Sequence, residues 1–199
     1  MNSRLTQQFR LGLPERQGMY DPSTEKDSCG VGFICDIKGR PSHAIIQDAQ
    51  RMNCCMIHRG GQGYEKNTGD GAGILTGLPD RFLREVVAED LGVELPEPGR
   101  YGAGIVFLPR EEHERLRAKE LFDERIAAEG QRLIGWRRVP VDPDGADLGK
   151  AARAAMPHVE MVLVGAGDGI EGDAFERRLY LIRKHVTHLV RAEPELTER

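Results

Sequence analysis

Residues 29–37 read Cys-Gly-Val-Gly-Phe-Ile-Cys-Asp-Ile, and this stretch decides the fold prediction. Every second residue from Cys29 is a cysteine or a large apolar residue, which is the period of a β-strand with one apolar face. Gly30 and Gly32 lie on the other face, where the missing side chains let another backbone or a ligand approach closely. The stretch is therefore predicted to be a strand beside which a ligand can lie.

Patterns typical of helices and strands alternate along the rest of the chain. Ser42 is expected to cap a helix that ends at residues 58–60, and Asp147 to cap a later, short one. Asp173 and Glu176 are expected to form a capping box at the last helix. The expected helices cover residues 42–60, 79–92, 110–129, 147–157 and 173–193, and the further expected strands cover residues 70–77, 101–108, 132–141 and 159–164. The side chains expected to face the core from the second and third helices are Phe82, Leu83, Val86, Val87, Leu116, Leu121, Phe122 and Ile126. In the last helix the apolar residues recur at steps of four, three, four and three, at Phe175, Leu179, Ile182, Val186 and Leu189. This alternation predicts the α+β fold class.

The composition argues against several classes of protein. The 199 residues carry 28 Lys and Arg against 32 Asp and Glu, a formal net charge of −4, so no general basic field favours nucleic acid. No run approaches the roughly 18 consecutive apolar residues of a membrane span, and residues 1–28 lack the apolar core of a secretory signal. We expect a cytoplasmic protein with thiols instead of disulfides, and residues 1–28 as a separate leader.

Two other patterns resemble cofactor sites but lack the right chemistry. Residues 167–172 have the G-x-G-x-x-G spacing of a dinucleotide-binding loop, yet the carboxylates of Asp168, Glu171 and Asp173 would repel a pyrophosphate. A plain turn is expected there. The four cysteines form no C-x-x-C pair, and no His-x-x-x-His pair lies near a cysteine, so no metal site is expected.

Cys29 is the candidate nucleophile, although a single cysteine is more often a small buried apolar residue. If the chain were cut between Ser28 and Cys29, the cysteine would carry an α-amino group, whose pKa ordinarily lies at about 7.7–8.0. That amine can accept the thiol proton and later donate a proton to a leaving amine. An N-terminal nucleophile of this kind needs no separate histidine.

Three motifs give the chain a resemblance to a known family. They are Cys-Gly-Val-Gly-Phe at residues 29–33, Met-Ile-His-Arg-Gly at 56–60 and Asn-Thr-Gly-Asp-Gly-Ala-Gly-Ile-Leu at 67–75. Together they resemble the opening of the large subunits of glutamate synthases, which is a class II glutamine amidotransferase domain. The resemblance implies an N-terminal-nucleophile αββα sandwich. Residues 1–28 would be a propeptide, and residues 29–199 would form the N-terminal part of the sandwich, incomplete at its C-terminus.

The resemblance also implies a chemistry. Cys29, exposed by removal of residues 1–28, would attack the side-chain amide of L-glutamine, and ammonia would leave. Water would then release glutamate from the resulting thioester. Arg59 matches a family arginine that lies close to the nucleophile, and the alternative for it is a structural ion pair at a helix C-terminus. The other residues expected to bind substrate or shape the site are Gly30, His58, Gly60 and Asp70.

The chain also departs from the family. Family domains are longer, and their later part supplies an Asn-Gly pair for the oxyanion hole, whereas none of the three asparagines here, Asn2, Asn53 and Asn67, is followed by glycine. We therefore expect the isolated chain to be inactive as a glutaminase. FMN and an iron–sulfur cluster are expected only in the remaining synthase domains or subunits, which are its expected partners. Two alternatives are a non-catalytic remnant or partner-binding subunit, and another class II amidotransferase, against which the Gly-Asp-Gly-Ala-Gly block argues.

Overall fold

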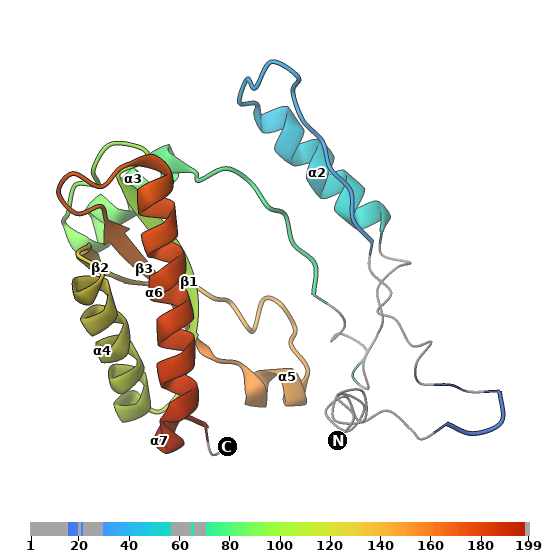
Figure 1. Cartoon of the computed structure of the whole chain (residues 1–199). Helices are drawn as coiled ribbons and strands as arrows, with labels where there is room; N and C mark the ends of the chain where they lie inside the picture. The colour runs from blue at the N-terminus through green and yellow to red at the C-terminus, as the bar shows by residue number, and fades with distance from the viewer. Residues whose placement is uncertain (1–15, 20, 22–29, 57–64, 66–70, 198–199) are drawn as a thin grey trace. The chain divides into compact units, whose positions relative to one another are not determined.

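The computed structural model describes residues 16–19, 21, 30–56, 65 and 71–197. The chain divides into two compact units, Met1–Ile74 and Leu75–Arg199, which are described separately below. In the first unit the structure describes one helix, α2 (His43–Cys55) (Figure 1). The second unit contains, in chain order, α3 (Asp80–Leu91), β1 (Tyr101–Leu108), α4 (Glu112–Ala128), β2 (Arg132–Arg138), α5 (Lys150–Ala155), β3 (His158–Gly165), α6 (Gly172–Ala192) and α7 (Pro194–Thr197). Helices and strands are mixed, so the α+β class is confirmed.

The second unit is built on a three-stranded antiparallel sheet in the order β1-β3-β2. β1 pairs with β3 from Tyr101 opposite Gly165 to Leu108 opposite His158. β2 pairs with the other edge of β3, and its register shifts between Leu133 and Gly135. β3 is the central strand, and residues 162–165 are buried. A strand covered on both faces carries a continuous apolar run, as Met-Val-Leu-Val does at residues 161–164.

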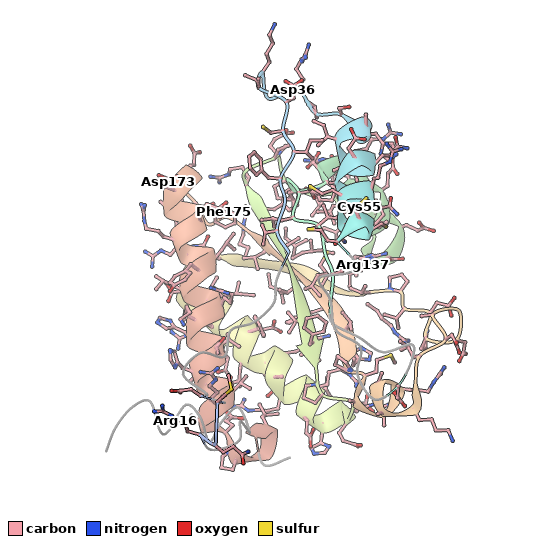
Figure 2. All side chains as sticks on the ribbon, turned by 90° about the vertical axis from the view of Figure 1, so that its right-hand side faces the viewer. Arg16, Asp36, Cys55, Arg137, Asp173 and Phe175 are labelled. Atoms are coloured by element: carbon pink, nitrogen blue, oxygen red, sulfur yellow. The ribbon has the colours of Figure 1, made fainter. Side chains whose placement is uncertain are left out.

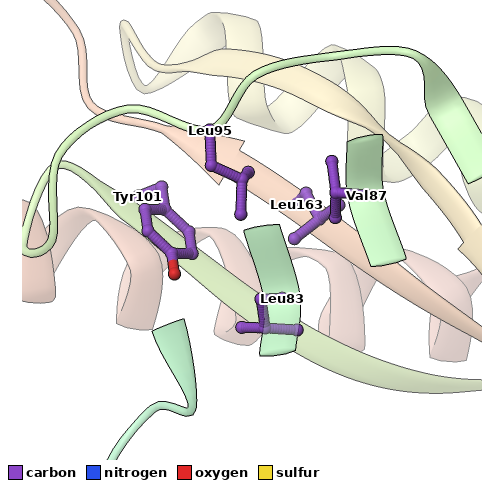
Figure 3. Close-up of a cluster of buried hydrophobic side chains, with 5 residues drawn as sticks. All are labelled: Leu83, Val87, Leu95, Tyr101 and Leu163. Carbon is purple, nitrogen blue, oxygen red and sulfur yellow. The ribbon is translucent and has the colours of Figure 1, made fainter. Parts of the chain in front are cut away.

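One face of this sheet is covered in part by α3. The cluster on that face contains Leu83 and Val87 of α3, Leu95 of the following loop, Tyr101 of β1 and Leu163 of β3 (Figure 3). Each of these side chains is at most 4% exposed. Burial of such side chains is worth roughly 1.5–3 kcal/mol each, which is why α3 docks on the sheet.

The opposite face is covered by α4 and α6, which lie side by side (Figure 1). The rings of Phe122 on α4 and Trp136 on β2 meet edge to face, with their centroids 5.4 Å apart. The buried cluster on this face consists of Ile126, Val162, Val164, Ile182 and Val186. The spacing predicted for the last helix is therefore confirmed: Phe175, Ile182 and Val186 are its buried residues.

Two of the predicted caps are wrong and one is right. Ser42 caps α2, since its hydroxyl oxygen accepts a 3.2 Å hydrogen bond from the backbone N–H of Ala44. Asp147 has a φ of +48°, which is incompatible with the extended backbone of an N-cap, and α5 follows Gly149 instead. The cap of α6 is Glu171, without a side-chain hydrogen bond, so the predicted capping box is not formed.

Two side chains predicted to face the core are exposed. Leu116 is 53% exposed because the buried side of α4 passes through Ala118, and residues two apart on a helix point in nearly opposite directions. Phe82 is 52% exposed, while its neighbour Leu83 is buried. In both helices the buried side is narrower than the apolar sequence pattern suggests.

The strands expected over residues 29–37 and 70–77 are not found. Residues 30–37 and 71–77, the described parts of these stretches, have no strand partner within the described residues. A strand exists only as part of a hydrogen-bonded sheet, so the period of the side chains does not suffice to form one. The three strands of the second unit form one sheet, so the second sheet of a sandwich is not seen in the described part of the chain.

Candidate active site

Most of the predicted site lies outside the described residues. Gly30 is described and exposed. The predicted site residues outside the described ranges are Cys29, His58, Arg59, Gly60 and Asp70. Their roles stay predictions, and what the structure does describe is the chain segments that flank them.

The segment after Cys29 packs along α2. A β-carbon on Gly32 would overlap the sulfur atom of Met52, so the two segments approach closely here and a larger residue would require the Met52 side chain to shift. Gly32 is thus a close-packing position, which agrees with the prediction that another part of the chain approaches this face. The neighbour is a helix side chain.

A tight turn joins the segment to α2. The Asp36 carboxylate accepts hydrogen bonds from the backbone N–H groups of Lys38, at 2.7 Å, and Arg40, at 3.3 Å. The Arg40 guanidinium binds the same carboxylate at 2.8 Å and is the main reason why the pKa of Asp36 is lowered. Figure 2 shows Asp36 beyond one end of α2, away from Cys55. The turn therefore sends the chain back along the segment it has just left.

This reversal brings Gly30 and Met56 to the same side of the first unit. Because residues 30–36 run antiparallel to α2 and Gly32 touches Met52, Gly30 lies at the end of α2 where Met56 follows the helix. Cys29 directly precedes Gly30 in the sequence, and residues 57–60 directly follow Met56. Gly30 and Met56 therefore lie on the same side of the first unit. In the sequence, Gly30 adjoins the predicted nucleophile and Met56 adjoins the segment with the His-Arg-Gly motif.

One side of this segment is uncovered. Val31, Phe33 and Ile37 are 91%, 89% and 99% exposed, and the thiol-bearing Cys35 between them is exposed as well. The alternation predicted from the sequence is present, but the apolar side chains point away from α2. Large apolar side chains in a row that face solvent mark a surface that another layer normally covers.

The glycine-rich loop over residues 167–172 is a closed turn, as predicted. The Arg100 guanidinium donates a 2.6 Å hydrogen bond to the Ile170 carbonyl, and the backbone N–H of Gly167 donates to the Gln131 side chain at 3.0 Å. The loop N–H of Gly167 therefore binds a protein group, whereas a phosphate-binding loop offers such groups to its ligand. Sequence reasoning missed Arg100 and Gln131 because each lies far from residues 167–172 in the sequence.

A buried carboxylate on β3 was also missed. Glu160 is 7% exposed and binds the Lys119 ammonium at 2.8 Å and the His158 ring at 3.0 Å. The same ammonium lies 5.0 Å from the centre of the Trp136 ring. The cluster ties α4 to the sheet and lies inside the second unit. In the sequence, only the alternation of inward- and outward-facing side chains along β3 could have marked Glu160 as buried. Its partner on α4 is 41 residues away.

Two other kinds of feature are absent from the described residues. No helix in the described ranges is long and apolar enough to cross a membrane. No group of three or more His, Cys, Asp and Glu side chains in those ranges is placed to hold a metal ion.

Comparison with protein families gives a match that begins at the predicted nucleophile. The model of the family "Glutamine amidotransferases class-II" matches residues 29–198. The chain belongs to the class II glutamine amidotransferases. The match covers most of the chain, including α2 and the whole sheet of the second unit, so both units are parts of the amidotransferase sequence.

Glutamate synthases are among the curated relatives of this amidotransferase chain. It is 41% identical to a glutamate synthase [NADPH] large chain of Bacillus subtilis over 173 residues, which are 86% of the chain and 11% of the relative. It is 41% identical to a glutamate synthase [NADH] of Schizosaccharomyces pombe over 187 residues, 91% of the chain and 9% of the relative. A ferredoxin-dependent glutamate synthase of Synechocystis is 40% identical over 80% of the chain and 10% of its own length. The chain thus spans about a tenth of the length of these relatives.

Proposed function

We propose that this chain is the glutamine-hydrolysing part of a glutamate synthase, with Cys29 as an N-terminal nucleophile. The observation that carries the proposal is that the class II amidotransferase match begins at Cys29. Residues 1–28 precede the match and would be a propeptide whose removal exposes the α-amino group of Cys29. The relatives at 40–41% identity are glutamate synthases, which points to glutamate formation as the purpose of the hydrolysis.

The proposed reaction proceeds in two steps on one sulfur atom. The Cys29 thiol gives its proton to its own α-amine and attacks the side-chain carbonyl carbon of L-glutamine. The C–N bond breaks, the ammonium donates a proton to the leaving nitrogen, and ammonia departs from a thioester. Water, deprotonated by the same amine, attacks the thioester carbon and releases glutamate and the thiol. Neither step needs an oxidant or a reductant.

The geometry of the first unit supports the proposed roles of the neighbouring residues. Gly30 and Met56, which adjoin Cys29 and residues 57–60 in the sequence, lie on one side of that unit, and this supports a role for Arg59 beside the nucleophile. We propose that the Arg59 guanidinium favours the thiolate and fixes the substrate geometry. Gly30, His58, Gly60 and Asp70 are proposed to shape the site around the glutamine.

We further propose that the fold of the family protein is an αββα sandwich. Two observations support it, one from each unit. In the first unit, Val31, Phe33 and Ile37 form an uncovered apolar face with strand alternation. In the second unit, α3 leaves part of one sheet face open, where Ile105 and Phe107 are 50% and 72% exposed. The inner layers of a sandwich carry such faces, because each layer covers the other.

The isolated chain is proposed to turn over glutamine slowly or not at all. It contains no Asn-Gly pair, and loss of an oxyanion-hole donor typically lowers the rate by about 10²–10³. FMN, an iron–sulfur cluster and the domains or subunits that bind them are proposed to lie outside these residues, because the spacing of the four cysteines suits no cluster. We propose a cytoplasmic location. A second candidate function is a non-catalytic, partner-binding subunit, for which the uncovered side chains of Val31, Phe33 and Ile37 offer an apolar surface.

Two measurements test the proposal. The mass of the chain after expression in its own host is expected to correspond to a protein that starts at Cys29. Expressed together with the remainder of the enzyme, the chain is expected to hydrolyse glutamine. Cys29→Ser is expected to abolish this activity, while Cys54→Ser, the same change at an exposed cysteine of α2, preserves it. An intact Met1 together with a Cys29→Ser variant of unchanged activity would refute the nucleophile and leave the partner-binding function.

A further inference from the structure

The outer side of α6 carries a row of basic residues. Arg177, Tyr180, Lys184, His188 and Arg191 follow one another at steps of three, four, four and three, which places them on one side of the helix. That side is opposite the one buried in the core. Among the described residues, no carboxylate lies within ion-pair distance of Arg177, Lys184 or Arg191, whereas the neighbouring Arg178 binds Glu129 at 2.8 Å. We call this row the basic stripe.

The outer side of α4 carries a second row with the same spacing and the opposite charge. It consists of His113, Leu116, Glu120, Glu124 and Ala127, again at steps of three, four, four and three. We call it the acidic stripe. The side chains of Glu120 and Glu124 are 62% and 68% exposed.

The acidic stripe keeps surplus negative charge. Glu120 and Glu124 share one cation, Arg117, which binds them at 3.2 Å and 3.8 Å and also binds Glu193 at 2.6 Å. Among the described residues, this one guanidinium is the cation that pairs with both Glu120 and Glu124, and a single positive charge cannot neutralise two carboxylates. One stripe therefore has cations without described partners, and the other has more carboxylates than cations.

Two ion pairs fix how the stripes are aligned. Arg117, near the start of α4, binds Glu193 at the end of α6, and Glu129, at the end of α4, binds Arg178 near the start of α6. The two helices are therefore antiparallel. Figure 1 shows them packed side by side. Lys184 consequently lies at the level of Glu124 along the helix layer.

The same alignment brings two further pairs of the stripes to matching levels, while Arg191 lies at the level of Leu116. His188 lies at the level of Glu120, and Tyr180, which is 54% exposed, at the level of the small, exposed Ala127. Along this outer surface, Lys184 and His188 thus lie level with carboxylates. A large residue, Tyr180, lies level with a small one. Within one molecule, the described residues of the two stripes form no ion pair with each other.

We propose that the outer face of α4 and α6 is an interface between two copies of this chain. A two-fold axis that runs along the helices, between α4 and α6, places α6 of each copy on α4 of the other and keeps every residue at its level. Lys184 of one copy then meets Glu124 of the other, and Tyr180 covers Ala127. Such an arrangement is a four-helix packing in which each contact occurs twice.

The area of the outer face of α4 and α6 indicates how stable the proposed dimer is. A helix of 21 residues is about 31 Å long, and packed helices lie about 8–10 Å apart, so the layer buries on the order of 1,000 Å² in total. This is the lower end for a specific interface. The dimer is therefore expected to be weak and to dissociate as salt screens its exposed charge pairs.

The test is sedimentation equilibrium of the full chain at low and at high salt. We expect a dimer at low salt whose dissociation constant rises at least tenfold in Lys184→Glu and in Glu124→Lys. The charge-swapped double variant, Lys184→Glu with Glu124→Lys, recreates the pair in reverse and is expected to restore dimerisation. Lys150→Glu, an equal charge change on the exposed side of α5, is the matched control and leaves the constant unchanged.

A second readout locates the contact directly. A zero-length carbodiimide joins an ammonium to a carboxylate only where the two touch, and Lys184 is the one lysine of the basic stripe. In a mixture of ¹⁴N- and ¹⁵N-labelled chains, we expect mixed-isotope peptides that link Lys184 to Glu124 or Glu120. A chain that stays monomeric, or a dimer that persists in every variant through another face, would overturn the proposal. So would a monomer that captures poly-L-glutamate through Lys184, because the stripe would then serve a different acidic partner.

Discussion

The Tyr101 hydroxyl donates a 2.8 Å hydrogen bond to the Asp80 carboxylate and so joins the first residue of β1 to the first residue of α3. On its other oxygen, the same carboxylate accepts a 2.9 Å hydrogen bond from Arg84, one turn along α3. The Arg84 guanidinium also binds the Leu95 carbonyl at 2.6 Å, in the loop that leads back to β1. Asp80 is therefore the centre of a polar network that holds α3 on the sheet.

Tyr101→Phe removes the hydroxyl and leaves the ring in place. Tyr101 is 3% exposed, and a hydrogen bond to a charged group contributes about 1.5–3 kcal/mol, so we expect a loss of about 1.5 kcal/mol in the free energy of unfolding at pH 7. Urea unfolding followed by the fluorescence of Trp136, the single tryptophan, measures it. Tyr180→Phe, a matched change at a half-exposed tyrosine, is the control and is expected to change stability by less than about 0.5 kcal/mol.

The same hydrogen bond makes stability depend on pH in the alkaline range. Burial, with the Asp80 hydrogen bond as the second cause, raises the pKa of Tyr101 from 10.0 to about 12. Because the neutral phenol is favoured in the folded state, its contribution is complete below pH 10 and is lost as the pH rises to about 12. We expect the stability advantage of the wild type over Tyr101→Phe to fall towards zero across this range. A difference that stays constant from pH 9 to pH 12 would contradict this expectation.

Gly167 is predicted to tolerate no side chain. A β-carbon there would overlap the carbonyl oxygen of Gly130, a backbone atom that cannot move without disturbing the turn after α4. We expect Gly167→Ala to destabilise the fold by about 1–3 kcal/mol. Gly104→Ala is the matched control, because its β-carbon would meet only the Val162 side chain, at an ordinary 3.5 Å. Equal stabilities of the two variants in urea unfolding would show that the loop over residues 167–172 is not closed as described.

The helices and strands of the second unit could be predicted because the apolar side chains of each element follow its helical or strand period and are buried against the sheet. The steps of Phe175, Ile182 and Val186 located α6 and its buried side correctly. The caps could not be predicted with the same success. Asp147 is a suitable residue type for a cap, but its positive φ results from the turn around it, which composition does not reveal.

For the candidate site, the sequence predicts which residues take part but not how they are arranged, because its motifs are short and local. Cys29 and Arg59 stand in short motifs, and the family match begins at the first of them. Arg100 and Glu160 could not be found in this way, since their partners lie 70 and 41 residues away. The strand period of residues 29–37 was read correctly as an alternation, but whether such an alternation becomes a strand depends on a partner elsewhere in the chain.

Phe107 and Leu163 lie on the same face of the sheet and are expected to respond to substitution in opposite ways. Odd-numbered residues of β1 and β3 share this face, where Leu163 is fully buried under α3 and Phe107 is 72% exposed. Leu163→Ala opens a cavity in a closed cluster and is expected to cost about 2–5 kcal/mol. Phe107→Ser removes a ring that no described neighbour covers and is expected to change the free energy of unfolding by less than about 0.5 kcal/mol.

The comparison of these two variants also tests the proposed sandwich. An uncovered apolar face binds the dye ANS, so Phe107→Ser is expected to lower dye binding at unchanged stability. In the complete enzyme, where the second layer of the sandwich is proposed to cover this face, the same substitution is expected to cost several kcal/mol, because it would then bury a hydroxyl in place of a ring. Urea unfolding of both proteins measures the difference. A Phe107→Ser variant that is equally harmless in the complete enzyme would show that no second layer covers this face.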